Sequence, residues 1–410
     1  MSPDLLASAA QEFGTPVYVY DLDAMLGRFA TLDRLFGQRF VVSYAVKSNP
    51  NVALLTALLP VVASFDVSSL FEAERAVKAG ASPERITFSG PAKRREELRR
   101  AISMGIGELV VESVDEARTA SALALAAGRT QDILVRINPL RMPRHFGVNM
   151  AGKPSQFGVD EEDLEPALDA IAALPGLRLA GFHIYSGTNC LDAGAIAENY
   201  AIFAEIFRRA ATHLDLRPAK LVFGSGFGIP YLPDEKALDV EALAALANPL
   251  IDALKAETRF GDTVCALEMG RWLVGPAGWL LTSIVSAKSS RGTEFRACDA
   301  GFNNHLAACG MMGTVIRRNW RFENVTNSKG AQGRFTLVGP LCTTIDILAS
   351  AVELPEARVG DVIAVAQSGA YGLTASPTRF ISHPEPREVL RSGDRLVDVT
   401  ESMLNHWHAA

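Results

Sequence analysis

The chain alternates short apolar runs with longer stretches whose apolar residues recur at helical spacing. Several runs are apolar on both faces, which is typical of strands buried in a parallel sheet. Eight of them precede Gly270: Val41–Ala45, Ala63–Val67, Ile86–Phe88, Leu109–Val111, Ile133–Ile137, Leu179–Ile184, Leu221–Phe223 and Val264–Leu267. Most are followed by a stretch that predicts a helix: Leu70–Ala79, Arg94–Met104, Ser113–Ala126, Glu161–Leu174, Ala195–Leu214 and Val240–Ala256. This repetition predicts an α/β fold, a closed (β/α)8 TIM barrel.

The pattern changes after Gly270, where strand-like segments dominate. These segments are Leu280–Ala287, Glu294–Cys298, Arg334–Val338, Asp361–Ala366 and Arg395–Val399. Thr15–Tyr20 also has the pattern of a strand, and we expect it to join them. The chain is therefore predicted to have two domains. One is a barrel over residues 30–270, and the other is a C-terminal antiparallel β domain that combines residues 271–410 with residues 1–29.

Composition excludes several kinds of partner. Of the 410 residues, 48% are hydrophobic and 21% are charged, as in ordinary globular proteins, and the formal net charge is −6. Nucleic acids and anionic membranes both require a basic surface, so neither is expected as a partner. No run approaches the about 18 apolar residues that a membrane span needs. The first residues, Met1–Asp4, lack the pattern of a secretory signal, so we expect a cytoplasmic protein.

The cysteines indicate neither a disulfide framework nor a metal site. They number five and are widely spaced, with no CxxC pair and no Cys/His cluster. They are Cys190, Cys265, Cys298, Cys309 and Cys342. For most of them a buried small hydrophobic side chain is the simplest interpretation.

Polar residues at the ends of the predicted strands are candidates for chemistry, because TIM-barrel active sites lie at the carboxyl ends of the strands. They are Lys47, Ser68, Arg136, His183, Ser186, Gly224–Gly228 and Glu268. Lys47 follows the first apolar run, and burial there would lower the pKa of its amine. A partly neutral amine is what a Schiff base with a carbonyl compound requires. Taken alone, Lys47 could equally be a solvated surface lysine.

Two glycine-containing turns suggest a phosphate site. Phe223–Gly228 follows one strand and Glu268–Arg271 follows the last. Glycines let backbone N–H groups approach a phosphate closely, although they could also form simple barrel corners. Together with Lys47 they suggest pyridoxal phosphate. Glu268 could then keep the pyridine nitrogen protonated and His183 could stack on the ring. The alternatives are a carboxylate paired with Arg271 and an ordinary core histidine.

Six ordered motifs together resemble the fold-type III pyridoxal-phosphate decarboxylases, which include diaminopimelate, ornithine and arginine decarboxylases. The motifs cover nearly the whole chain: Tyr44–Asn51, His183–Gly187, Gly224–Gly228, Glu268–Gly275, Gly339–Cys342 and Ser368–Gly372. The resemblance implies that Lys47 forms the Schiff base, that His183 stacks on the cofactor ring and that Glu268 pairs with its nitrogen. It further implies a cofactor-binding set of Arg136, Ser186, Gly226, Phe227, Gly228, Gly270, Arg271 and Tyr371, with Arg136 near the phenolic side and the others around the phosphate.

Cys342 is similar to the family's cysteine that reaches into the partner subunit's active site, where a thiol can protonate the carbanion left by CO2 loss. The resemblance therefore implies a homodimer with shared active sites. In each site Glu268 and Cys342 would belong to different chains.

Departures from the family pattern bear on the substrate. Diaminopimelate decarboxylases carry an arginine and a tyrosine after the Asp-Ala-Gly turn, whereas here Asp299–Leu306 continues with Ala307 and Met311. Loss of that guanidinium removes a carboxylate contact worth roughly 1.5–3 kcal/mol. Ornithine decarboxylases carry an aspartate directly after the site cysteine, where this chain has Thr343, although Asp346 follows closely. These departures argue against free diaminopimelate and against small diamine precursors such as ornithine and lysine, which are the alternative substrates.

The stretch from His305 to Asn319 is similar to a biosynthetic subgroup that decarboxylates conjugated amino acids. Known members act on citryl-diaminopropionate in siderophore assembly, or on glutamyl units held by an acyl carrier protein. We expect a substrate of this kind, with a carrier protein as a candidate partner. Arg317 and Arg318 could meet an anionic appendage or could be a solvated surface pair. The loop Met142–Phe157 is a candidate lid, and its His145, like Asp346, is a candidate substrate contact.

Two other functions stay open. A racemase or epimerase on a related barrel would break the Cα–H bond, but its pyridine nitrogen commonly faces an arginine, so Glu268 favours decarboxylation. A catalytically inactive binding protein on this fold would be expected to lack Lys47 or Cys342, and both are present. We therefore expect a carboxy-lyase.

Overall fold

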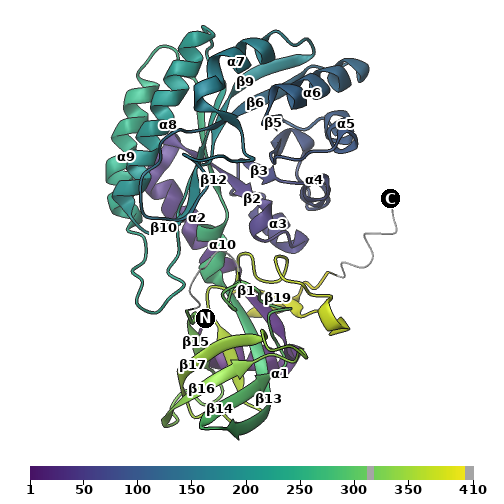
Figure 1. The fold of residues 1–410 in the computed structure, drawn as a ribbon, viewed down its shortest axis with the longest axis vertical. Coiled ribbons are helices and arrows are strands. Elements are labelled where there is room, and N and C mark those ends of the chain that lie inside the picture. The colour runs from purple at the N-terminus through teal and green to yellow at the C-terminus, as the bar shows by residue number, and fades with distance from the viewer. Residues whose placement is uncertain (312–317, 402–410) are drawn as a thin grey trace. The chain divides into compact units, whose positions relative to one another are not determined.

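The structure, a computed structural model, describes residues 1–311 and 318–401, and its chain divides into two compact units. The first unit consists of Met1–Gly27, Pro230–Lys236 and the chain from Arg271 onward. The second consists of Arg28–Ile229 and Ala237–Gly270. Figure 1 shows the second unit as helices around a ring of strands and the first as a twisted sheet.

The second unit is a closed barrel of eight parallel strands. Each strand pairs with the next, and the pairings β12–β2 and β5–β6 complete the circle. The strands, in spatial order, are β2 (Val41–Ala45), β3 (Ser64–Val67), β4 (Ile86–Phe88), β5 (Glu108–Val111), β6 (Gln131–Asn138), β9 (Leu177–Ile184), β11 (Lys220–Gly224) and β12 (Val264–Met269). Each agrees with one of the eight predicted runs to within two residues at either end, and the predicted barrel is confirmed.

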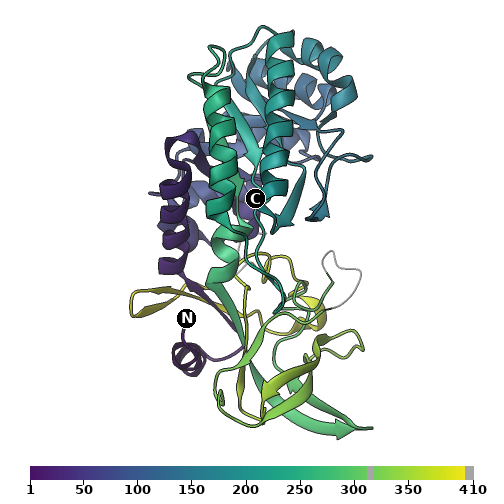
Figure 2. The same ribbon diagram turned by 90° about the vertical axis from the view of Figure 1, so that its left-hand side faces the viewer.

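Helices surround the barrel, and most follow a strand directly (Figure 1). They are α2 (Leu22–Phe36), which begins in the first unit, α3 (Val52–Leu58), α4 (Leu70–Lys78), α5 (Arg95–Met104), α6 (Val114–Ala126), α7 (Leu164–Ala172), α8 (Ala193–His213) and α9 (Val240–Lys255). Ser69 and Ser113 cap α4 and α6, each accepting a backbone N–H from the glutamate three residues on. Such caps fix the turn between a strand end and its helix. Figure 2 shows α8 and α9 packed side by side on the outside of the barrel.

The barrel interior is packed with apolar side chains. Val110, Leu134, Ala180, Val222 and Ala266 come from five different strands and form one buried cluster. The barrel is therefore a core and not a channel, and chemistry is confined to the strand ends.

Shorter elements lie beside the barrel circle. β7 (Phe146–Asn149) pairs antiparallel with β10 (Gly187–Cys190), and β8 (Val159–Asp160) pairs with β6. The chain from Pro139 to Gly158, which includes β7, is called the 139–158 segment below. The 3-10 turns are η1 (Gly37–Arg39), η2 (Val46–Ser48), η3 (Pro83–Arg85), η4 (Glu161–Asp163), η5 (Gly275–Ala277) and η6 (Phe380–Ser382).

The first unit is built on a sheet that runs β17-β16-β14-β13-β1-β19-β20, with β18 paired to β13 and β15. Its strands are β1 (Val17–Asp21), β13 (Gly278–Ser290), β14 (Thr293–Cys298), β15 (Phe322–Asn324), β16 (Gln332–Val338), β17 (Ile347–Pro355), β18 (Val362–Val365), β19 (Arg387–Ser392) and β20 (Arg395–Asp398). Its helices are α1 (Pro3–Phe13) and α10 (Arg271–Val274). The sheet is largely antiparallel, as predicted, and two of its pairings, β1–β19 and β14–β16, are parallel.

The N-terminal strand belongs to this sheet, as the sequence predicts. β1 lies between β13 and β19, and Val17 and Val19 pack in a buried cluster with Leu6 of α1 and Leu281 of β13. None of the helices within residues 1–311 and 318–401 has the length and apolar character needed to cross a membrane.

Candidate active site

Lys47 lies in η2, directly after β2, at the carboxyl mouth of the barrel. Its Nζ donates to Glu268 Oε1 at 2.9 Å and to Asp66 Oδ2 at 3.3 Å, and it lies 5.6 Å from the centroid of the Tyr185 ring. The side chain is 36% exposed, so its burial is partial. The barrel thus places a lysine amine between two carboxylates contributed by two other strands.

Glu268, in β12, connects Lys47 to His183. Its Oε2 lies 2.9 Å from His183 Nε2, while Oε1 accepts from Lys47. Burial by itself would raise the pKa of this carboxyl, but the charge of Lys47 and the bond to His183 outweigh burial and hold the pKa well below its usual range. Burial lowers the pKa of His183 despite the opposing effect of Glu268. A carboxylate therefore faces a lysine on one side and a mainly neutral imidazole on the other.

Asp66, near the end of β3, is a site residue that was not predicted from the sequence. It is buried, and its Oδ1 accepts the hydroxyl proton of Ser89 at 2.8 Å. Burial, reinforced by the negative charge of Glu268, raises the pKa of Asp66 to about 8. The available signal was a charged residue inside Ala63–Val67, a run predicted to be a buried strand, because charged side chains are almost never fully buried unless they are paired.

The glycine turns are needed for close packing. Gly226 has φ +71°, and a Cβ there would lie 2.7 Å from a ring atom of Phe146. A Cβ on Gly228 would lie 2.7 Å from the carbonyl oxygen of Cys190, and the Gly228 amide already donates to that oxygen. A Cβ on Gly270 would lie 2.7 Å from Ser48, the residue after Lys47. The turns are as tight as predicted, while their contact with a phosphate, and that of Phe227, stay predictions.

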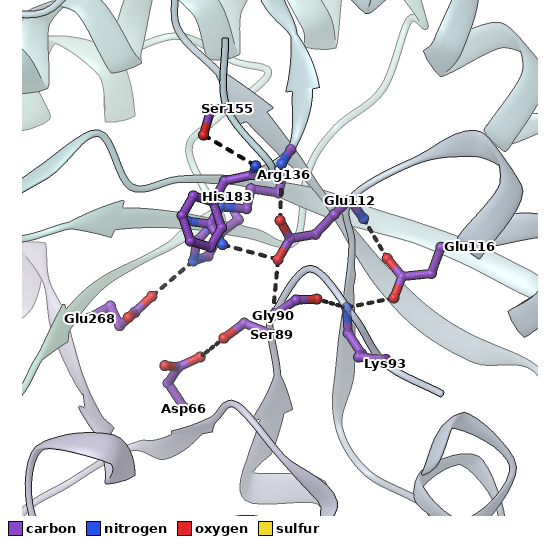
Figure 3. A network of polar contacts seen from close by, with 12 residues as sticks. Asp66, Ser89, Gly90, Lys93, Glu112, Glu116, Arg136, Ser155, His183 and Glu268 are labelled. Carbon is purple, nitrogen blue, oxygen red and sulfur yellow. Dashed lines mark hydrogen bonds and ion pairs between the residues drawn. The ribbon is translucent and has the colours of Figure 1, made fainter. Parts of the chain in front are cut away.

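Two further predicted cofactor residues lie in the barrel unit with partners of their own. Ser186 is fully buried, and its hydroxyl donates to Asn199 Oδ1 at 3.0 Å. Arg136 donates from Nη1 to Glu112 Oε1 at 3.0 Å, and its guanidinium lies 4.5 Å from the centroid of the Phe157 ring. Figure 3 shows Arg136 and Glu112 in a group of polar side chains that also includes His183 and Glu268. Their roles toward the cofactor stay predictions.

Arg271 and Tyr371 belong to the first unit and contact each other there. The Arg271 guanidinium lies 4.8 Å from the centroid of the Tyr371 ring, and its Nη1 donates to the Tyr231 hydroxyl at 2.5 Å. Tyr371 has φ +55°, which only a strongly determined turn tolerates in a residue of this size. Their contact with the cofactor phosphate stays a prediction.

The predicted substrate residues are divided between the two units of the chain. Arg318 is exposed and donates to both oxygens of Asp234 at 2.7 Å. Asp346 is buried and accepts the backbone N–H groups of Phe302 and Leu341 at 2.8 Å, which favours a role in shaping its loop. His145 is exposed at φ +77°, and Arg317 lies outside the described residues. Their roles toward substrate stay predictions.

Cys342 differs from the other four cysteines. It is exposed, whereas Cys190, Cys265, Cys298 and Cys309 are buried, as the sequence predicts for most of them. An exposed thiol is available to another chain, which is the placement that the predicted shared site requires.

The barrel residues fit a bound pyridoxal phosphate. The amine of Lys47 can bond to an aldehyde, and Glu268 can accept from a protonated ring nitrogen once that amine has left it. His183 Nδ1 is buried without a partner among residues 1–311 and 318–401, although buried polar atoms are almost always paired. The chain leaves a polar position at the mouth for another molecule to fill.

Comparison with known proteins agrees with this chemistry. Residues 22–275 match the family described as "Pyridoxal-dependent decarboxylase, pyridoxal binding domain". Over 94% of this chain and 91% of its own length, the L-glutamyl-[BtrI acyl-carrier protein] decarboxylase of Niallia circulans is 32% identical. The diaminopimelate decarboxylase of Zymomonas mobilis is 31% identical over 95% of this chain and 90% of its own.

Two further relatives extend the range of substrates and supply a solved structure. The 2-[(L-alanin-3-ylcarbamoyl)methyl]-2-hydroxybutanedioate decarboxylase of Staphylococcus aureus is 28% identical over 90% of this chain and 92% of its own. The crystal structure of Helicobacter pylori diaminopimelate decarboxylase complexed with L-lysine is 27% identical and covers 96% of this chain and 95% of its own, with a TM-score of 0.85. This chain is a member of the pyridoxal-dependent decarboxylase family, a carboxy-lyase that uses pyridoxal phosphate.

Proposed function

We propose that this decarboxylase removes the α-carboxylate of a modified or conjugated amino acid, in siderophore or other secondary-metabolite biosynthesis. Two relatives support the proposal by their names, since one acts on a glutamyl unit linked to an acyl carrier protein and the other on an amino acid joined to a hydroxybutanedioate. Both substrates carry a large appendage beyond the amino acid. An acyl carrier protein is accordingly a candidate partner.

The absence of a cation in Asp299–Met311 is the observation that carries the proposal. That stretch contains no lysine or arginine, and burial lowers the pKa of its histidine, His305, to about 3, so it is neutral at pH 7. His305 is instead held by Ser368 at 3.0 Å and by an edge contact with the Trp320 ring. The distal carboxylate of free diaminopimelate would find no charged partner in this stretch.

Cations are concentrated in the 139–158 segment instead. It contains Arg141, Arg144 and Lys153, together with His145, and no aspartate or glutamate, although the whole chain has a net charge of −6. Arg144, His145 and Lys153 are exposed, while Arg141 is paired with Glu205 at 3.2 Å. The segment adjoins the barrel mouth, because β7 pairs with β10 and the Met150 amide donates to the Ser186 carbonyl. These cations suit an anionic appendage.

The site residues have distinct tasks in the reaction. When bound, pyridoxal phosphate accepts the electron pair released as CO2 leaves Cα. Lys47 holds the cofactor covalently, and its freed amine can exchange a proton with Asp66, whose pKa of about 8 suits transfer near neutral pH. Glu268, kept ionised by its low pKa, can stabilise a proton on the pyridine nitrogen. Cys342 of the partner subunit is proposed to protonate Cα.

Replacing Lys47 by alanine tests the reaction class. Turnover should fall by roughly 10³-fold or more, because proton transfer alone contributes about 10²–10⁴-fold and covalent attachment is lost as well. The visible absorption of the lysine-bound cofactor should also disappear. Lys220→Ala is the matched control, since Lys220 pairs with Glu108 at the opposite end of the barrel strands. An unchanged absorption band in Lys47→Ala would contradict the assignment.

A substrate panel tests the finer proposal. CO2 release should be compared for glutamyl acyl carrier protein, a citrate–diaminopropionate amide, free diaminopimelate, ornithine and lysine. Two charge-assisted contacts to an appendage would give the preferred conjugate roughly a 100-fold higher kcat/KM than a free amino acid. Diaminopimelate is the second candidate, because several relatives carry its name. If diaminopimelate is turned over best, the conjugate proposal is wrong.

A further inference from the structure

Glu112, the residue after β5, is a buried carboxylate that joins three separate parts of the barrel mouth. Its Oε1 accepts the Gly90 amide at 2.9 Å and Arg136 Nη1 at 3.0 Å, and its Oε2 accepts the Gly158 amide at 2.9 Å. Gly90 follows β4, Arg136 lies in β6, and Gly158 ends the 139–158 segment. Figure 3 shows Glu112 at the centre of these contacts. A buried carboxylate with this many donors is well satisfied and holds its donors in place.

A second ion pair fixes Glu112 from the other side. The Glu112 amide donates to Glu116 Oε2 at 2.7 Å, and Lys93 Nζ donates to Glu116 Oε1 at 2.6 Å and to the Gly90 carbonyl at 2.5 Å. Gly90 is therefore held through its N–H by Glu112 and through its C=O by Lys93. The Lys93 side chain is only 2% exposed. The hydrogen bonds close a ring, which leaves Glu112 little freedom to move.

The end of the 139–158 segment is attached to this ring. The Arg136 guanidinium lies over the Phe157 ring, 4.5 Å from the centroid of that ring. Such cation–π contacts stabilise by about 0.5–2 kcal/mol. Gly158 has φ +72°, and a Cβ there would lie 2.9 Å from the Arg136 carbonyl oxygen. The close approach and the positive φ both require glycine. The segment is thus anchored on the same arginine that Glu112 orients.

The other end of the segment is attached differently. There β7 pairs with β10 through backbone hydrogen bonds, and the Phe146 ring packs over Gly226. This backbone pairing holds the β7 end of the segment next to β10. At the Gly158 end, β8 pairs with β6, and the bond from the Gly158 amide to the Glu112 carboxylate holds the residue just before β8 next to Arg136.

We propose that Glu112 is a positioning residue for the decarboxylase, which sets the guanidinium of Arg136 and holds the 139–158 segment over the barrel mouth. Glu112 acts through Arg136 and Gly158 and not on reacting atoms. Its loss weakens the hold of the segment on substrate without removing Lys47, Glu268 or His183. The expected effect on KM rests on the proposed binding of substrate by this segment, whereas the expected effect on hydrogen exchange does not.

The test compares Glu112→Gln with Glu108→Gln. Glu108 begins the same strand and is also ion-paired, to Lys220 at 3.0 Å, but at the opposite end of the barrel. In the cofactor-free protein, hydrogen exchange of the amides in residues 155–160 should be at least about 10-fold faster in Glu112→Gln, because the Gly158 amide loses a charged acceptor. In the loaded enzyme KM should rise about 10-fold while kcat changes less than about 3-fold, which marks lost uniform binding. Glu108→Gln should match the wild type in both measurements.

A second variant guards against misfolding of Glu112→Gln. Gly158→Ala alters no charge but forces the segment away from Arg136, and it should give the same rise in exchange and in KM. If both variants fold with the wild-type circular dichroism and show wild-type exchange and KM, Glu112 has no positioning role. Faster exchange in a protein that turns over no conjugated substrate would support the role of Glu112 and refute the proposed substrate class.

Discussion

At the scale of single residues, the buried Asp66 lowers the stability of the folded protein as the pH rises. Buried beside Glu268, it has its pKa raised to about 8, so the folded protein keeps a proton that the unfolded chain releases near pH 4. Stability falls with pH wherever the folded state binds more protons than the unfolded state. Asp66 should therefore lower the stability of the cofactor-free protein progressively between about pH 4 and pH 8, and by a constant amount above that.

Replacing Asp66 by asparagine should remove this pH dependence. The melting temperature of Asp66→Asn, relative to wild type, should increase from pH 5 to pH 8.5, as measured by calorimetry on cofactor-free protein. Asp252→Asn is a suitable control, because the hydrogen bond from Arg39 lowers the pKa of that exposed carboxyl and the substitution offers no gain at high pH. A difference between Asp66→Asn and wild type that is the same at both pH values would contradict this account.

Individual site residues could be predicted where they lie at the carboxyl end of an apolar run. Lys47, His183 and Glu268 do so, and in the structure Glu268 is hydrogen-bonded to both of the others. Asp66 and Glu112 also lie at or directly after such ends and were missed, because what marks them is contact with residues far along the chain: Ser89 for Asp66, and Gly90 and Gly158, 22 and 46 residues away, for Glu112. Contacts of that kind depend on the closed barrel and leave no local pattern in the chain.

At the scale of elements, the barrel strands could be predicted because they are buried on both faces and give continuous apolar runs. β17 and β19 were not predicted. Each has exposed positions among its buried ones, and β17 pairs with β16 through shifts of register. Such a mixture of buried and exposed positions gives a weaker hydrophobic pattern in the sequence than a fully buried strand does. A shift of register cannot be recognised in the sequence. The sheet order of the first unit therefore needed the structure.

The 139–158 segment permits a prediction at this scale. Replacing both Arg144 and Lys153 by serine should raise KM for an anionic conjugate by roughly 10-fold with little change in kcat, since exposed charges attract an anion without touching the reacting atoms. The effect should shrink at high salt. Arg141→Ser is the control, because Arg141 already has Glu205 as a partner and should contribute less. Steady-state kinetics at two salt concentrations measure both effects, and an equal KM for all three proteins would remove these cations from substrate binding.

At the scale of the whole molecule, the proposed homodimer would complete each site with Cys342 of the partner subunit. The proposal rests on the exposure of Cys342 and on the family's pattern, and it requires two chains for every active site. Lys47→Ala and Cys342→Ala should then each abolish most activity alone. Mixed so that subunits exchange, they should recover about a quarter of wild-type activity, because half of the dimers are mixed and each of those has one site free of both substitutions.

A second mixture separates shared sites from simple association. Lys47 and Glu268 hydrogen-bond within one chain at 2.9 Å, so a dimer that combines Lys47→Ala with Glu268→Gln has one substitution in each of its sites. That mixture should stay inactive while native mass spectrometry shows the mixed dimer. Recovery in the first mixture and not in the second would assign Cys342 to the opposite chain. Without recovery in a demonstrated Lys47→Ala/Cys342→Ala dimer, Cys342 would have to act within its own chain, and the proposed sharing of sites between subunits would be wrong.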